Sequence, residues 1–155
     1  MRQDVAKLMN AIGTYKIFST ISGAADKCLD IKDASQANSA PLILYTDTKK
    51  DNQAFHICHV KDGYFALVAS HSLKVLDVKQ AKKTNGTPVI QYPYSGNDNQ
   101  LWKLKQVDNG LFIICSKLNE NMVLDITKAS NANGTPLIIY EYRNTANQKF
   151  KLKKV

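Results

Sequence analysis

The chain has 155 residues, a length that fits one domain with a core of its own. Its apolar fraction of 44% and charged fraction of 22% are ordinary for a globular protein and exclude a disordered or fibrous chain. The net charge of +8 would suit a polyanion, but the lysines stand singly or in pairs, with no arginine cluster interleaved with aromatic residues. We therefore expect a basic surface and no nucleic-acid partner.

The predicted elements, in chain order, begin with a leader or short helix over residues 1–12, where Val5, Leu8, Met9 and Ile12 lie at helical spacing. This segment lacks the continuous hydrophobic region of a secretory signal, and no apolar run is long enough to span a membrane. We expect no membrane insertion and a protein that is cytoplasmic or released without such a signal. A mature secreted form stays open.

From residue 13 onward every predicted element is a strand, because the segments are short, rich in Ile, Val, Leu, Tyr and Phe, and separated by turn residues. They fall into three copies of one pattern, at about residues 13–60, 61–107 and 108–155. Each copy opens with a strand led by an aromatic or leucine residue, and the last strand, 149–153, alternates polar with apolar residues. The pairs Asn85-Gly86 and Asn133-Gly134 predict hairpin turns, with Asn38-Ser39 in their place in the first copy.

The offsets between the copies are constant. Asp30 and Asp77 are 47 positions apart, Asp77 and Asp125 are 48 apart, and the prolines, tyrosines and Asn-Gln pairs keep the same spacing. Three copies are too few for a β-propeller. Four strands in each of three copies predict an all-β fold, the β-trefoil, with twelve strands related by a pseudo-threefold axis.

The cysteines are Cys28, Cys58 and Cys115, an odd number, so at least one thiol is free. Cys58 lies between His56 and His59, but a metal site normally needs a second pair of ligands. We expect neither a metal ion nor a cofactor.

The sequence resembles the ricin B-type lectin family, whose repeat mark is Gln-x-Trp. That mark is seen here as Gln53-Ala54-Phe55, Gln100-Leu101-Trp102 and Gln148-Lys149-Phe150. The resemblance covers residues 13–155, and Phe in place of Trp keeps a large buried ring. It implies a binding domain for glycans or glycoproteins that carry galactose or N-acetylgalactosamine, with a homodimer or a toxin subunit left open as a further partner.

In this family an Asp, an aromatic residue fifteen positions later and an Asn seven positions after that hold the sugar, and the adjacent Gln supports them. We add the isoleucine two positions before each aromatic residue. The resemblance then implies three sites, composed of Asp30, Ile43, Tyr45, Asn52 and Gln53; of Asp77, Ile90, Tyr92, Asn99 and Gln100; and of Asp125, Ile138, Tyr140, Asn147 and Gln148.

The chemistry of the three residue types suits a pyranose. A tyrosine ring packs against the apolar face of the sugar, while a carboxylate and an amide together bind a pair of hydroxyl groups. A structural role also stays open for each polar residue, because Asp forms turns and Asn-Gln can bridge a barrel rim. We place the aspartates on the rim, so that replacing all three by Ala should leave the fold intact.

The sequence departs from the plant-toxin members, whose repeats often carry an internal disulfide. Cys28 fills the first disulfide position, but Asp47 fills the second, so Cys28 is predicted to be a free thiol. Tyr94 and Tyr142 fill that second position in the other copies, where we expect core or rim rings first and sugar contacts second.

An enzyme is not expected, because the sequence has no nucleophile elbow, phosphate loop or zinc-protease motif, and its site aspartates fall one per repeat. Two other binding functions stay open. One is a module for a polysaccharide such as xylan, which uses the same residue types. The other is a trefoil protease inhibitor or heparin-binding factor, which would not need intact Asp-Tyr-Asn sets.

Overall fold

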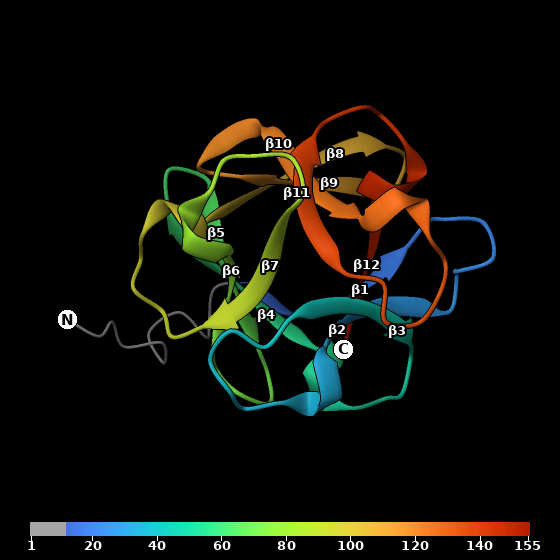
Figure 1. Cartoon of the computed structure of the whole chain (residues 1–155), viewed down its shortest axis with the longest axis horizontal. Coiled ribbons are helices and arrows are strands. Elements are labelled where there is room, and N and C mark those ends of the chain that lie inside the picture. Colours follow the sequence, from blue (N-terminus) through green and yellow to red (C-terminus); the bar gives the residue numbers. More distant parts are fainter. Residues whose placement is uncertain (1–11) are drawn as a thin grey trace.

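The computed structural model describes residues 12–155 (Figure 1), so the leader or helix predicted for residues 1–12 lies outside them except for Ile12. The first repeat holds β1 (Gly13–Ser19), β2 (Lys27–Ile31), β3 (Leu42–Thr46) and β4 (Phe55–Lys61). The second holds β5 (Tyr64–Ala69), β6 (Val75–Val78), β7 (Thr87–Tyr92) and β8 (Trp102–Asp108). The third holds β9 (Leu111–Ser116), β10 (Asn119–Ile126), β11 (Leu137–Glu141) and β12 (Phe150–Lys154). The predicted twelve-stranded, all-β trefoil is confirmed.

Six of these strands close a barrel. Hydrogen-bonded pairing runs from β1 to β4, β5, β8, β9 and β12 and back to β1, so no edge of the ring is left unpaired. Each repeat contributes its first and last strand to the ring. The first strand of a repeat pairs with the last strand of the preceding one, which ties the repeats together.

The other six strands form three hairpins, β2–β3, β6–β7 and β10–β11, that cap one end of the barrel. Their second strands meet around the centre of the view in Figure 1. There an isoleucine of each of these strands pairs with the proline near the start of the equivalent strand of a neighbouring repeat, in the contacts Pro41–Ile90, Pro88–Ile138 and Pro136–Ile43. The cap is therefore held by the same contact three times.

The main core lies between barrel and cap. Phe55, Trp102 and Phe150, the aromatic residues of the repeat marks, are fully buried in one apolar cluster. The indole N–H of Trp102 also donates to the carbonyl of Leu76 at 3.1 Å. The predicted exchange of Trp for Phe is thus accommodated as a buried ring, and only the indole hydrogen bond is lost in the other two repeats.

Two smaller apolar clusters confirm the expectation for the other rings. Tyr94 is buried beside Cys58 and Val75, and Tyr142 packs partly buried against the cluster that contains Cys115. Cys28 is free, as predicted, and so are Cys58 and Cys115. Burial raises the pKa of the Cys28 thiol to about 12 and that of Cys58 to about 11.

The Asn-Gly turns differ from the prediction in their setting. They do not close tight two-residue hairpins, because residues 79–86 and 127–136 separate the paired strands. Each turn reaches across to the next repeat, where the N–H of Gly86 donates to Ile139 at 2.9 Å and the N–H of Gly134 to Leu44 at 2.7 Å. The longer connections leave room for the short 3₁₀ helices described below.

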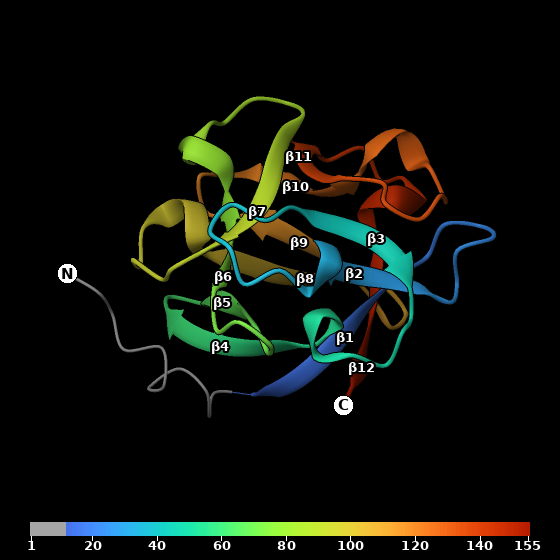
Figure 2. The same cartoon turned by 60° about the horizontal axis from the view of Figure 1, so that its bottom comes forward.

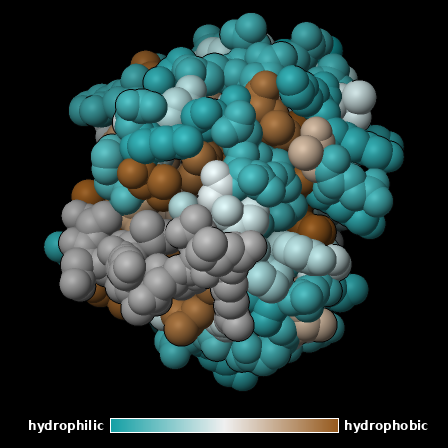
Figure 3. Space-filling model, turned by 90° about the vertical axis from the view of Figure 1, so that its left-hand side faces the viewer, coloured by the Kyte–Doolittle hydropathy of each residue, from teal (hydrophilic) through white to brown (hydrophobic). Residues whose placement is uncertain are grey.

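The surface is mainly polar on the side of the molecule that carries much of the second repeat. Figure 3 shows hydrophobic atoms there in small, separate areas between hydrophilic ones. Within residues 12–155, no helix is long and apolar enough to cross a membrane.

Candidate functional site

Strand register brings the first members of each predicted site together. Asp30 lies opposite Ile43, Asp77 opposite Ile90 and Asp125 opposite Ile138 in the cap hairpins. Directly opposed residues of an antiparallel pair share one face, and so does the tyrosine two positions after each isoleucine. Asp, Ile and Tyr of each repeat therefore lie on the same side of their hairpin.

A single 3₁₀ turn supplies the remaining two members. In the second repeat this is η5 (Asp98–Gln100). The side-chain amide of Asn99 donates to Asp77 Oδ1 at 3.1 Å, and that of Gln100 donates to Asp77 Oδ2 at 2.8 Å. The same two amides also donate to the carbonyls of Val78 and Pro93, at 3.2 and 3.0 Å. Each amide thus links the aspartate to the backbone of its own hairpin.

The other two repeats reproduce this network. In the first, η3 (Asp51–Gln53) places Asn52 at 3.2 Å and Gln53 at 2.8 Å from the Asp30 carboxylate. In the third, η7 (Ala146–Gln148) places Asn147 at 3.1 Å and Gln148 at 2.9 Å from that of Asp125. The structure therefore brings all predicted polar members together within each repeat.

Each glutamine supports its site from inside. Gln53, Gln100 and Gln148 are at most 1% exposed, and each accepts a backbone N–H with its Oε1, from Thr48 at 2.9 Å, Ser95 at 2.7 Å and Arg143 at 2.8 Å. Because the glutamine amide spans the aspartate and the loop that follows the tyrosine, it fixes the position of one relative to the other.

The aspartates are not rim residues, and this part of the prediction was wrong. Asp30, Asp77 and Asp125 are only 4–5% exposed. Burial raises the pKa of each above the ordinary 3.8, and the hydrogen bonds from the neighbouring Gln and Asn offset the effect only in part. Replacing all three by Ala would remove the acceptors of six buried or partly buried hydrogen bonds that the Asn and Gln side-chain amides donate, so the change would lower the stability of the fold.

The tyrosines, in contrast, face outward. Tyr45 is 39% and Tyr92 is 43% exposed, which is unusual for large rings on a well-packed hairpin. In the first repeat Tyr45 lines a pocket of about 370 Å³ together with Asp30, Ile43 and Asn52. In the third repeat Tyr140 lines one of about 430 Å³ together with Asp125, Ile138 and Asn147. These pockets combine one aromatic face, one carboxylate and one amide.

Sequence reasoning missed the wall opposite the ring. It is a 3₁₀ turn directly after the aspartate strand, η2 (Lys32–Ala34), η4 (Lys79–Ala81) or η6 (Thr127–Ala129), and in each the last two residues have φ between 50° and 58°. Residues with a Cβ rarely adopt this left-handed conformation, and pairs of them cluster where function holds them. The signal was available, because Ala34, Ala81 and Ala129 are identical at equivalent positions. The first and last of these line the two pockets.

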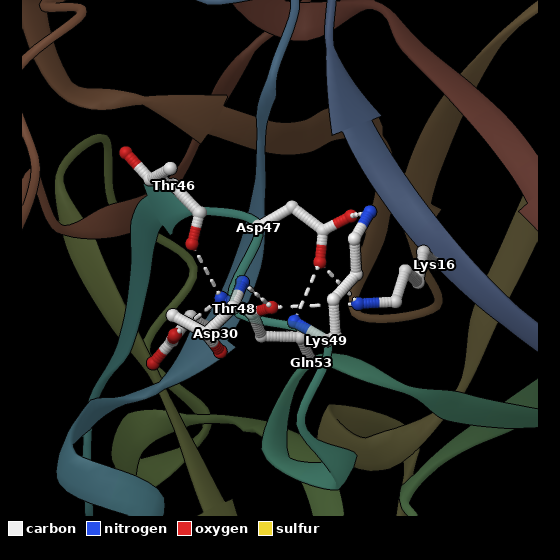
Figure 4. Close-up of polar contacts among 7 residues, drawn as sticks. All are labelled: Lys16, Asp30, Thr46, Asp47, Thr48, Lys49 and Gln53. Atoms are coloured by element: carbon white, nitrogen blue, oxygen red, sulfur yellow. Dashed lines mark hydrogen bonds and ion pairs between the residues drawn. The ribbon is translucent and has the colours of Figure 1, made fainter.

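The first site carries an ion-pair cluster behind its glutamine (Figure 4). Lys16 and Lys49 contact the two oxygens of the Asp47 carboxylate at 2.6 and 2.8 Å, and Lys16 also donates to Gln53 Oε1 at 3.4 Å. Burial alone would raise the pKa of Asp47, but the hydrogen bonds from Lys16 and Lys49 together hold it well below its ordinary range. Asp47, at the position where the plant-toxin members carry the second cysteine, thus ties the loop after β3 to β1 through an ion pair with Lys16.

The third site differs in its ring. The Arg143 guanidinium lies over Tyr140 with its carbon 4.8 Å from the ring centroid, and it pairs with Glu141 at 2.7 Å. Tyr140 is accordingly partly buried, whereas its two counterparts are exposed. A ligand that stacks on this ring has to displace the arginine.

The same Asp-Asn-Gln network recurs in three cap hairpins, each with a tyrosine on the same face that is exposed in the first two repeats and partly buried in the third. This arrangement corresponds to a known domain. The family model for the ricin-type β-trefoil lectin domain matches residues 7–92 and 51–140. The chain belongs to this family. It is therefore a domain of the carbohydrate-binding, lectin type, and no curated protein sequence shows significant similarity to it.

Solved structures agree with this assignment. A designed protein with threefold symmetry, ThreeFoil, is 38% identical, with a TM-score of 0.87 over 92% of this chain and 99% of that one. The exo-β-1,3-galactanase 1,3Gal43A from Clostridium thermocellum is 31% identical with a TM-score of 0.88, and the match spans 95% of this chain but only 31% of that enzyme. A ricin B-like lectin from Macrolepiota procera, solved in complex with lactose, is 18% identical with a TM-score of 0.78 over 94% and 98% of the two chains.

Proposed function

We propose that this domain is a non-catalytic, multivalent lectin for glycans that end in galactose or N-acetylgalactosamine. The observation that carries the proposal is the threefold repetition of one arrangement, a tyrosine beside a buried carboxylate that is held by two amides, with the ring exposed in the first two repeats and covered by Arg143 in the third. The barrel does not require exposed rings at these positions. A pyranose supplies both an apolar face for the ring and a hydroxyl pair for the polar groups.

The electrostatics of each site favour a neutral sugar with adjacent hydroxyls. Burial raises the pKa of the site carboxylate because water solvates it incompletely. Sugar hydroxyl groups that donate to this carboxylate therefore supply hydrogen bonds that water does not fully provide. In the first site the Oδ1 of Asn52 is buried and makes no hydrogen bond within residues 12–155.

Galactose is favoured over other hexoses by two similarities. One structural relative was solved with lactose, and another is a galactanase, although each of those descriptions belongs to that protein alone. A catalytic function is disfavoured because each site aspartate is already bonded to two amides of its own repeat and has no second carboxylate among those partners.

Shallow pockets of this kind bind one sugar weakly, with a Kd on the order of 0.1–1 mM. Three such sites on one rigid domain would act together on a glycan-coated surface, with a gain of about a hundredfold or more where the spacing fits. We therefore expect weak binding to free galactose and strong binding to glycoproteins.

A glycan array tests the proposal, with the wild type beside two triple variants. Changing Tyr45, Tyr92 and Tyr140 to Ala removes the exposed rings and spares the buried network, so the fold should persist while array binding is lost. Changing the same three residues to Phe keeps the ring faces and serves as the matched control, which should bind. The proposal fails if the triple Ala variant binds galactosides as the wild type does, or if the wild type binds xylan chains or sulfated glycans and no galactoside.

A further inference from the structure

The three seams between the repeats occupy equivalent positions in the fold but differ in their contacts. At two of them an asparagine from one repeat caps the chain just after the site tyrosine of the next. Asn133 Oδ1 accepts the N–H of Thr46 at 3.0 Å, and Asn85 Oδ1 accepts that of Glu141 at 2.9 Å. These contacts close the two seams next to Tyr45 and Tyr140.

The third seam lacks this contact. Asn38 occupies the position equivalent to Asn85 and Asn133, but the residue after Tyr92 is Pro93, which has no N–H to donate. The loop that carries Asn38 still runs beside β7 in both ribbon views (Figure 2), where the N–H of Ser39 donates to the Gln91 carbonyl at 2.9 Å. The side chain of Asn38 is therefore left exposed at the edge of an open seam.

A pocket of about 520 Å³ occupies this seam, within the range typical of small-molecule sites and larger than the pockets at the first and third sites. Leu73, Tyr92, Pro93 and Tyr94 give it apolar walls, and Asn38 lies at its rim. Tyr92 belongs both to this pocket and to the second candidate site. A ligand on the exposed ring of Tyr92 is thus adjacent to a second hollow, whose lining is completed by the polar residues Ser72, Lys74 and Ser95.

Leu73 is the unexpected residue of this pocket. It is 48% exposed and has a φ of 59°, a left-handed conformation that is a clear outlier for a leucine. The equivalent positions hold Asp26 and Asn121, both polar. Leu73 thus gives the pocket an exposed apolar side chain at a position where the other two repeats carry polar residues.

The pocket walls are held in place by hydrogen bonds, so the hollow is preformed. Gln91 is fully buried and donates to the carbonyls of Ser35 and Ala37, both at 2.8 Å, while it accepts from the Ser72 hydroxyl at 2.8 Å. Lys74 is tied to the carbonyl of Gln36 at 2.8 Å. Among residues 12–155, Lys74 is the one charged side chain of the lining and it is thus engaged, while the other lining groups are apolar or neutral.

We infer that this seam pocket is an accessory subsite, unique to the second repeat, for the neutral pyranose linked to the sugar held at Tyr92. The inference rests on the proposed function. Apolar walls receive the C–H face of that second sugar, and the Asn38 amide meets its hydroxyl groups. The second site is then selective for a disaccharide, while the first and third hold single terminal sugars.

The test uses a single-site protein in which Tyr45→Ala and Tyr140→Ala remove the other two rings. Affinities for methyl β-galactoside, lactose and the β1,3-linked disaccharides galactosyl-galactose and galactosyl-N-acetylgalactosamine are measured by NMR titration. Leu73→Asn removes the apolar wall with a residue that tolerates the left-handed conformation. Pro93→Thr restores an N–H for Asn38 and closes the seam. Pro88→Thr, which replaces a proline of β7 outside the pocket, is the matched control.

We expect at least one disaccharide to bind roughly three- to tenfold more tightly than methyl β-galactoside, and Leu73→Asn and Pro93→Thr to remove that advantage while Pro88→Thr keeps it. Binding of methyl β-galactoside itself should change little in all three variants. If no disaccharide has an advantage, or the advantage survives Leu73→Asn, the subsite is refuted and the galactoside site stands. If methyl β-galactoside does not bind the single-site protein, the proposed function fails and the subsite fails with it.

Discussion

The variant Asp77→Ala separates the two roles that a buried site carboxylate has in this fold. It deletes the acceptor shared by Asn99 and Gln100, whose amides donate at 3.1 and 2.8 Å. It also removes the group that we expect to bind two sugar hydroxyls. Both the stability of the domain and the binding at the second site should therefore fall, by amounts that the structure allows us to estimate.

The loss of stability is moderate because two effects oppose each other. Two hydrogen bonds to a charged acceptor contribute about 1.5–3 kcal/mol each. Against this, burial raises the pKa of Asp77, so the ionised carboxylate itself is unfavourable in the folded state, and both amides keep a backbone carbonyl as partner. We expect a net loss of roughly 1–3 kcal/mol, and a fall in Tm of roughly 3–10 °C for a domain of this size.

The loss of binding should be larger. Two charge-assisted hydrogen bonds to hydroxyl groups correspond to at least about a hundredfold in Kd, which takes a weak site beyond detection. Calorimetric unfolding and an NMR titration with methyl β-galactoside measure the two effects. Asp98→Ala is the control, since that neighbouring side chain is 54% exposed and its one ion pair within residues 12–155 is with Lys117 at 3.0 Å, so the change should alter neither the Tm nor the binding. An unchanged second site in Asp77→Ala would refute the role of the carboxylate, and an unchanged Tm would refute the network.

Three further predictions concern pH, the third site and the thiols. Sugar binding should weaken as the pH is lowered from neutral toward about 4, with a midpoint above 3.8, because the pKa values of the three site carboxyls are raised. The same carboxyls stabilise the fold below pH 3.8, and this stabilisation is lost as the pH rises through their folded-state pKa values. An NMR pH titration in which binding and fold are lost together would contradict the assignment. Arg143→Ala should strengthen binding at the third site by roughly two- to fivefold, since a stacked guanidinium no longer has to leave Tyr140, and a weaker third site in an NMR titration would show that the arginine contacts the sugar instead. All three cysteines should resist a thiol reagent at neutral pH in the native state, because they are buried and burial raises their pKa values. After unfolding without reductant all three should react, and fewer than three reactive thiols would reveal a disulfide.

The fold and the membership of the sites were predictable because repetition carries information that a single segment does not. Asp, Tyr and Asn recur at fixed offsets, and in a structure with a pseudo-threefold axis such residues must occupy equivalent places. The burial of the aspartates was not predictable in the same way. In β6 all four residues, Val75–Val78, are buried, because the turn of the Asn-Gln pair covers the face that strand alternation would assign to solvent.

Features that break the symmetry were also beyond the sequence reasoning. The stacking of Arg143 on Tyr140 depends on a rotamer that the sequence does not specify. The sequence shows that proline follows the site tyrosine only in the second repeat. It does not show that Pro93 opens a seam, because that depends on the contacts in which asparagines of neighbouring repeats accept the N–H of the equivalent residues Thr46 and Glu141. The structural effect of a sequence difference between the repeats can therefore be inferred only when the contact across the seam is known.

A crystal structure of the wild-type domain soaked with methyl β-galactoside tests the central claim most directly. The account predicts a sugar ring stacked on Tyr45 and on Tyr92, and on Tyr140 with Arg143 displaced, with two adjacent hydroxyl groups within hydrogen-bonding distance of the carboxylate and amide of the same repeat. Sugar bound elsewhere on the domain, with these three clusters empty at a saturating concentration, would contradict it.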